Sequence, residues 1–169
     1  MGKEDRFKYP VAQRFFCTRC GLCCGDTNER KRHILLLKNE ADEIAVAVSQ
    51  PVLAFAKRIR GKAPYVYEIR KTDEIGACVF LQNDKCLIYP FRPLVCRFYP
   101  FELKKAADQG HEFLCTKECP GINKGKILEP NYYAQLFEIA QARLSPDQTE
   151  QRKHNDGYRL PKTSAFSKI

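Results

Sequence analysis

The hydrophobic pattern in the first third of the chain predicts a short strand followed by two helical segments. The longest apolar run, residues 34–37, fits a short strand. Asn39 is a good helix N-cap, acidic residues follow it, and apolar residues then recur on one helical face. Pro51 should end this helix, and residues 52–59 can form a second helical piece that closes at Gly61.

Strand-like stretches occupy the middle of the chain. Residues 65–69 have the aromatic and β-branched content of a strand. Residues 78–81 and 85–89 predict two further short strands, and residues 82–84 between them suit a tight turn. The proline-rich stretch at 90–100 predicts irregular backbone or a short helix.

The C-terminal part predicts one helix and then a polar tail. Across residues 131–144 apolar side chains recur at helical spacing. From Ser145 onward the sequence turns polar and basic, which is typical of a tail on the surface. We therefore divide the chain into a cysteine-bearing domain, residues 1–145, and a basic polar tail, residues 146–169.

Composition and charge bound the class of protein. The chain has 169 residues and a formal net charge of +9, enough for one modest core. No apolar run approaches the roughly 20 residues of a membrane span, and residues 1–6 have no hydrophobic signal region. We expect a soluble cytoplasmic protein without a membrane partner. Its oligomeric state stays open.

Two basic runs, residues 30–32 and 57–62, are candidate contact surfaces. They could meet a nucleic acid or an acidic protein. A solvated charged face is the simpler explanation, since no RNA-recognition or helix-turn-helix signature accompanies them.

The nine cysteines are the most unusual feature of the composition. Cys17, Cys20 and Cys23 repeat the C-x₂-C step twice, as in bacterial ferredoxins, and Cys24 follows directly. Cysteines spaced in this way can turn their sulfurs onto one metal while backbone N–H groups donate to the thiolates. Neighbouring side chains of an extended chain point apart, so we expect Cys23 and Cys24 to serve different metal positions.

The cysteine count supports one or two metal centres. An odd number of cysteines and the missing signal region weigh against the alternative of a disulfide framework. Four cysteines of the first cluster plus four of the later five would make two tetrathiolate sites, with the remaining thiol a small buried hydrophobe. Such sites suit zinc and iron–sulfur equally. The ferredoxin-like spacing favours an iron–sulfur cluster, [4Fe–4S] above all.

Other polar residues are weaker candidates. Arg92 and Arg97 flank Cys96 and can offset the negative charge of a thiolate centre, or simply be surface or capping arginines. Three histidines are possible ligands: His33, His111 and His154. None has zinc-like spacing to a cysteine, which favours exposed or core positions for them.

Several separated motifs, in order, resemble a known family, the CxxCxxCC family of zinc- or iron-chelating domains, over about residues 16–125. The motifs are Phe16-Cys17-x-x-Cys20-Gly21-x-Cys23-Cys24, Cys78-x-Phe80-Leu81, Cys86-x-Ile88-Tyr89, Arg92-Pro93-x-x-Cys96-Arg97-x-x-Pro100 and Cys119-Pro120-Gly121. The resemblance implies eight metal ligands: Cys17, Cys20, Cys23, Cys24, Cys78, Cys86, Cys96 and Cys119. Cys115 is then the extra thiol, unless it replaces one of them.

The same resemblance leaves the activity open. A flagellin lysine N-methylase contains a similar domain, which implies iron–sulfur-dependent methyl transfer to protein lysines as one alternative. The other is a zinc-stapled module that binds nucleic acid or protein. We expect instead a metal-binding protein whose centre is structural or transfers electrons. The expected fold is α+β: a small metal-stapled single domain with short strands, irregular cysteine-bearing loops and a C-terminal helix.

Overall fold

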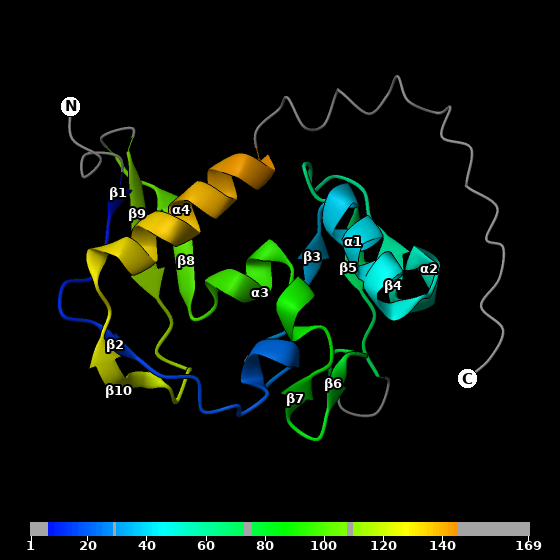
Figure 1. Cartoon of the computed structure of the whole chain (residues 1–169), viewed down its shortest axis with the longest axis horizontal. Helices are drawn as coiled ribbons and strands as arrows, with labels where there is room; N and C mark the ends of the chain where they lie inside the picture. The colour runs from blue at the N-terminus through cyan, green and yellow to red at the C-terminus, as the bar shows by residue number, and fades with distance from the viewer. Residues whose placement is uncertain (1–6, 29, 73–75, 108–109, 145–169) are drawn as a thin grey trace, which may run out of the picture.

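The computed structural model describes residues 7–28, 30–72, 76–107 and 110–144 (Figure 1). It confirms the α+β class, because it contains both helices and short, mostly antiparallel strands, and a helix ends the described part. The predicted tail, residues 146–169, and His154 lie outside the described residues. The division into a domain and a tail therefore stays a prediction.

One hydrophobic cluster forms around a three-stranded antiparallel sheet. The strands lie in the order β3 (Leu35–Leu36), β5 (Tyr67–Ile69) and β4 (Ala56–Arg58). Helices α1 (Lys38–Val48) and α2 (Val52–Phe55) lie beside this sheet. Each of these strands and helices contributes side chains to the cluster. They are buried together with Phe80 and Ile88 from the loops that follow.

A second cluster, rich in aromatic rings, fills the other side of the molecule. Its sheet has the order β1 (Phe7–Lys8), β9 (His111–Cys115) and β8 (Phe101–Lys105). Helix α4 (Pro130–Leu144) crosses over this sheet (Figure 1). Tyr133 on α4 is fully buried against Phe101 and Phe113, with ring centroids 5.4 and 5.2 Å away.

Helix α3 (Leu94–Phe98) lies between the two clusters. Leu94 and Phe98 are buried in the aromatic cluster, whereas Val95 and Cys96 pack against the first one. The buried carboxylate of Glu40 on α1 accepts the backbone N–H of Leu94 at 2.7 Å. This bond fixes the start of α3 because a buried N–H needs an acceptor.

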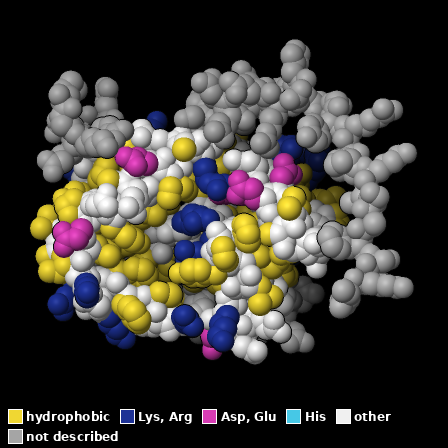
Figure 2. Space-filling view, in the orientation of Figure 1, with side chains coloured by type: hydrophobic (Ala, Val, Ile, Leu, Met, Phe, Trp, Pro, Cys, Tyr) yellow, Lys and Arg dark blue, Asp and Glu magenta, His cyan; other side chains and the backbone are white. Residues whose placement is uncertain are grey.

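The remaining elements are short and carry or flank the cysteines. They are two 3₁₀ turns, η2 (Leu22–Cys24) and η3 (Tyr89–Phe91), and two antiparallel strand pairs. The pairs are the hairpin of β6 (Leu81–Gln82) with β7 (Lys85–Cys86), and the long-range pair of β2 (Arg14–Phe15) with β10 (Ile122–Ile127). On the face shown in Figure 2, Lys and Arg side chains gather in the middle, between apolar areas on either side.

The sequence predicted the order of the central elements but not all of their boundaries. Helix α1 begins at Lys38 with Leu37 as its N-cap, so Asn39 lies inside the first turn. The Glu40 carboxylate, 3.0 Å from the Leu37 N–H, supplies the cap from within. Residues 56–58 form strand β4 rather than continuing a helix, because they pair with β5.

Further differences concern strands. Cys78 makes only an isolated bridge to Lys71 in place of the strand predicted at 78–81. The short-helix alternative for the proline-rich stretch is confirmed by α3, and the C-terminal helix by α4. Strands β1, β2, β8, β9 and β10 were not predicted. In the described part of the chain, every helix is too short or too polar to cross a lipid bilayer.

Candidate metal centre

All nine cysteines belong to the described residues, and all nine are free thiols. Their mutual effects on pKa separate eight of them into two groups. The inner group, whose members act on one another, is Cys23, Cys24, Cys78, Cys86 and Cys96. The outer group is Cys17, Cys20 and Cys119. The sequence had implied eight ligands and a division into four and four.

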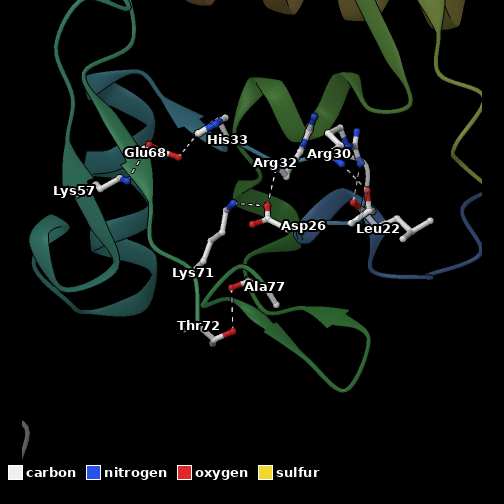
Figure 3. Close-up of polar contacts among 11 residues, drawn as sticks. Leu22, Asp26, Arg30, Arg32, His33, Lys57, Glu68, Lys71, Thr72 and Ala77 are labelled. Carbon is white, nitrogen blue, oxygen red and sulfur yellow. Dashed lines mark hydrogen bonds and ion pairs between the residues drawn. The ribbon is translucent and has the colours of Figure 1, made fainter. Parts of the chain in front are cut away.

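A clamp around Asp26 joins the first cysteine cluster to the segment that leads to Cys78 (Figure 3). The Asp26 carboxylate accepts the Lys71 ammonium and, at 2.7 Å, the backbone N–H of Arg32. These two hydrogen bonds hold the pKa of Asp26 below its usual value. The backbone N–H of Cys78 in turn donates to the Cys24 carbonyl. Cys24 and Cys78 are therefore tied together through the main chain.

The β6–β7 hairpin adds Cys86 to the inner group. Asn83 and Asp84 both have positive φ, 48° and 58°, which suits the two-residue turn between the strands. Leu81 pairs with Cys86, and the Leu81 N–H donates to the Cys78 carbonyl at 2.9 Å. The turn chemistry of this local sequence therefore sets the separation of Cys78 and Cys86.

Backbone N–H groups point at three of the sulfurs. The N–H of Phe80 donates to Cys78, that of Ile88 to Cys86, and that of Gly121 to Cys119. Each donor lies two residues after its cysteine. Such bonds favour the thiolate, because they stabilise negative charge on sulfur.

Burial nevertheless is the largest influence on the pKa values of three inner thiols, Cys78, Cys86 and Cys96. It raises the pKa of Cys78 to about 11 and that of Cys96 to about 12, and it raises the pKa of Cys86. Neighbouring thiols raise these values further by like-charge repulsion. As apo thiols, these cysteines therefore resist ionisation near neutral pH.

Two guanidinium groups act in the opposite direction. Arg32 lowers the pKa of Cys23 and Cys96, and Arg92 lowers that of Cys23 and Cys86. The sequence had proposed Arg92 for this role but had placed Arg32 in a basic run interpreted as a solvated face or a surface for an acidic partner. Arg97 serves as a capping arginine instead: its guanidinium donates to the carbonyls of Arg92 and Pro90, both at 2.7 Å.

Cys23 and Cys24 lie closer together than the sequence predicted. They belong to the 3₁₀ turn η2 rather than to an extended segment, and their sulfurs are 3.7 Å apart. The expectation that their side chains point apart is wrong for this reason. The hydrogen bond from the Cys24 thiol is the largest cause that lowers the pKa of Cys23, to about 6, and it raises the pKa of Cys24.

The outer group is assembled by a close backbone contact. The Phe16 N–H donates to the Gly121 carbonyl at 3.0 Å. A Cβ at Gly121 would lie 2.2 Å from the Phe16 carbonyl oxygen, so only glycine fits there. Cys17 follows Phe16 and Cys119 precedes Gly121 by two residues, which places them near each other. Cys119 is buried, with a pKa raised chiefly by burial, whereas Cys17 and Cys20 are exposed.

The other candidate ligands have structural partners. Nδ1 of His33 is 2.6 Å from Glu68, whose carboxylate also pairs with Lys57 at 3.3 Å. The ring of His111 packs on Phe137 at 5.3 Å between centroids. The extra thiol, Cys115, is half-buried against the aromatic cluster and lies 3.5 Å from the side-chain oxygen of Gln13.

The arrangement gathers donors without closing a coordination sphere. Within the described residues, no three His, Cys, Asp or Glu side chains already stand where they could hold one metal ion. The eight ligands that the sequence implied thus stay a prediction. Sequence reasoning missed Asp26 and Lys71, which position the cluster, because no local pattern distinguishes a clamp from an exposed charge.

The fold and the site together define a class: a cysteine-rich α+β protein with grouped free thiols. The chain belongs to the CxxCxxCC family, described as "Putative zinc- or iron-chelating domain", whose model matches residues 16–124. Zinc or iron chelation by the cysteine cluster is therefore the family's description of this site.

Two curated relatives come from Methanocaldococcus jannaschii. The uncharacterized protein MJ0661 is 23% identical over 180 residues, covering 91% of this chain and 94% of that protein. The uncharacterized protein MJ0939 is 39% identical over 62 residues, which cover 34% of this chain and 22% of that longer protein. No solved structure matches the chain.

Proposed function

We propose that the protein holds two cysteine-ligated metal centres, one in the inner and one in the outer thiol group. The observation that carries this proposal is the gathering of five free thiols from four separate segments into the inner group. Crowded thiols repel one another as they ionise. A cationic centre would reverse that repulsion, since coordination deprotonates a thiol outright.

The surroundings of the inner group fit such a centre. A zinc ion or a [4Fe–4S] cluster with four thiolates carries about two negative charges. The guanidinium groups of Arg32 and Arg92 lie close enough to the inner thiols to offset these negative charges. The N–H groups of Phe80 and Ile88 are aimed at sulfurs, and such bonds tune and stabilise metal thiolates.

For the inner group we favour an iron–sulfur cluster over zinc. The sulfurs around one tetrahedral zinc lie about 3.8 Å from one another, given Zn–S bonds of about 2.3 Å. A four-iron cluster keeps its thiolates farther apart, because several irons lie between them. The C-x₂-C spacing of the first cysteine cluster, which resembles that of ferredoxins, favours iron–sulfur chemistry. The sulfurs of Cys23 and Cys24 are only 3.7 Å apart, so one of them would ligate a four-iron cluster together with Cys78, Cys86 and Cys96. When bound, a cluster would supply one-electron redox chemistry and cross-link the segments.

The outer group has three thiols and leaves a fourth position to another ligand. Two of its members, Cys17 and Cys20, are exposed. A metal there would meet solvent, and exposed sites with an open position exchange their ligands readily. We therefore assign a structural role to the inner centre and an exchangeable metal to the outer group.

Anaerobic purification followed by analysis of iron, zinc and acid-labile sulfide tests the proposal. The expected result is a brown protein with about four irons and four sulfides in the inner group, plus a metal that a mild chelator removes. A colourless protein with stoichiometric zinc would retain metal binding but refute the cluster. Protein that folds fully without metal would overturn the structural role of the inner centre, and protein that holds neither iron nor zinc would overturn both centres.

A further inference from the structure

A groove of about 790 Å³ runs between the chain that follows η2, helix α3, the β8–β9 sheet and the end of α4. Neither exposed outer thiol lines it. Arg32 at its edge also faces the inner thiols Cys23 and Cys96, but neither the family description nor the metal proposal gives the groove a ligand. Its volume is typical of sites for small organic ligands. The groove combines a cationic end with apolar walls, and both features bear on what it can bind.

Arg30 and Arg32 form the cationic end (Figure 3). Their guanidinium groups lie side by side over the Tyr99 ring, 5.6 and 5.2 Å from its centroid. The Nε atom of each is buried, and neither has a hydrogen-bond partner among the described residues. A buried N–H donor without an acceptor is costly, so this pair is suited to an incoming anion.

The charges that line the groove leave one guanidinium in surplus. Arg30 pairs with Glu118 at 3.2 Å, and Lys104 pairs with Glu102 at 3.4 Å. Arg32 has no carboxylate within ion-pair distance in the part of the chain that the structure describes. Arg32 also faces the inner thiols, but a planar guanidinium without a carboxylate partner can still bind a monovalent carboxylate through two parallel hydrogen bonds.

The walls beyond this end are apolar. Leu114 on β9 and Leu144 at the end of α4 line the groove with 39% and 40% of their surface exposed. Exposed leucines beside a cationic end favour a ligand that has an apolar body. The chain's own residues 145–169 are a poor occupant, because they carry five Lys and Arg against three Asp and Glu.

We propose that this groove binds a small monocarboxylate with an apolar body, its carboxylate on Arg32 and Arg30 and its body along Leu114 and Leu144. The proposal rests on the groove and not on the metal centres. It changes the interpretation of the basic run at 30–32, which the sequence had favoured as a solvated face. Only Lys31 of that run is exposed.

Titration of the full-length, anaerobically purified protein with 4-phenylbutyrate, followed by NMR or calorimetry, tests the site. The expected result is saturable binding at one site, with at least about tenfold weaker binding of the neutral 4-phenylbutanol. Absence of saturable binding, or equal binding of the alcohol, overturns the proposal. If phenyl phosphate binds as tightly as 4-phenylbutyrate, the proposal that the groove prefers a carboxylate is overturned.

Variants separate the groove from general attraction to a basic protein. We expect Arg32→Gln and Leu114→Glu each to weaken 4-phenylbutyrate binding at least about tenfold. The control Arg58→Gln, on β4 against Tyr67 and outside the groove, should leave it unchanged. Because Arg32 also acts on inner thiols, metal content is measured for every variant. Unchanged affinity in metal-replete Leu114→Glu, or equal weakening in Arg58→Gln, would sink the proposal.

Discussion

The inner and outer thiol groups differ although the same C-x₂-C steps supply both. The inner group draws on η2, the Cys78 segment, β7 and α3, and it packs against the first hydrophobic cluster. The outer group depends on one backbone contact between Phe16 and Gly121 and has two exposed members. Burial is the largest cause that raises the pKa of Tyr99, and thiols of both groups, Cys119 and Cys23, raise it further.

This difference teaches that cysteine spacing alone does not define a centre. Cys20 and Cys23 are separated by the same step as Cys17 and Cys20, yet they fall into different groups. The turn at η2, with Gly21 at φ 73°, redirects the chain between them. Gly21, which tolerates this left-handed backbone, thus decides which sulfurs lie close together.

The largest expected effect comes from removing one inner ligand. Cys96→Ser should give metal-depleted, aggregating protein, because a structural metal centre can supply roughly 10 kcal/mol or more of folding free energy. Soluble yield and bound metal per chain are the measurements.

The matched variant for this test is Cys119→Ser in the outer group. It should lose only the exchangeable metal and remain folded by circular dichroism. If the two variants behave alike, the distinction between a structural and an exchangeable centre is wrong.

A further substitution, Gly121→Ala, disturbs the backbone contact that assembles the outer group. Gly121→Ala should lower the free energy of unfolding by about 4 kcal/mol, because its Cβ would overlap the Phe16 carbonyl oxygen at 2.2 Å. The outer metal should be lost while the inner centre is retained. Urea unfolding and metal analysis report the two effects.

Gly61→Ala is the control for backbone strain alone. Gly61 also has a positive φ, 73°, but nothing lies within 4 Å of the position that a Cβ would take there, so only about 1 kcal/mol should be lost. A full outer metal complement in Gly121→Ala would contradict the role of the close contact.

A third variant disturbs the inner group from a distance. Glu40→Ala removes the buried acceptor of the Leu37 and Leu94 N–H groups and should cost about 2–3 kcal/mol. Because Leu94 begins the helix that carries Cys96, inner metal should also bind less tightly. Glu43→Ala, which removes an exposed pair with Arg143, is the control and should change little.

The smallest effect concerns pH. With pKa values of about 11 for Cys78 and about 12 for Cys96, and a raised value for Cys86, these thiols are protonated at pH 7. A metal must displace about three protons to bind them, so its affinity should rise with pH between 6 and 8. Proton release when zinc is added to freshly reduced metal-free chain measures the number, since thiols of an unfolded chain are also protonated at pH 7. Affinity that is independent of pH would contradict the assigned ligands.

The sequence predicted those structural features that depend on residues close together in the chain. The α4 helix, the turn at Asn83 and the run that became β3 follow from spacing and turn chemistry within a few residues. Strand β4 did not, because residues 56–58 become a strand only through pairing with β5. The same holds for β8 and β9, whose partners make them a sheet.

The sequence by itself determined that this protein is an α+β member of a cysteine-cluster family, since its motifs and their order are properties of the chain. Only the tertiary structure decided which sulfurs lie together, that Arg32 rather than Arg97 faces them, and that a basic–apolar groove exists. The physical reason is that burial, repulsion between thiols and ion pairing depend on distances through space. Residues such as Asp26 and Lys71 acquire their role only when folding brings them into contact.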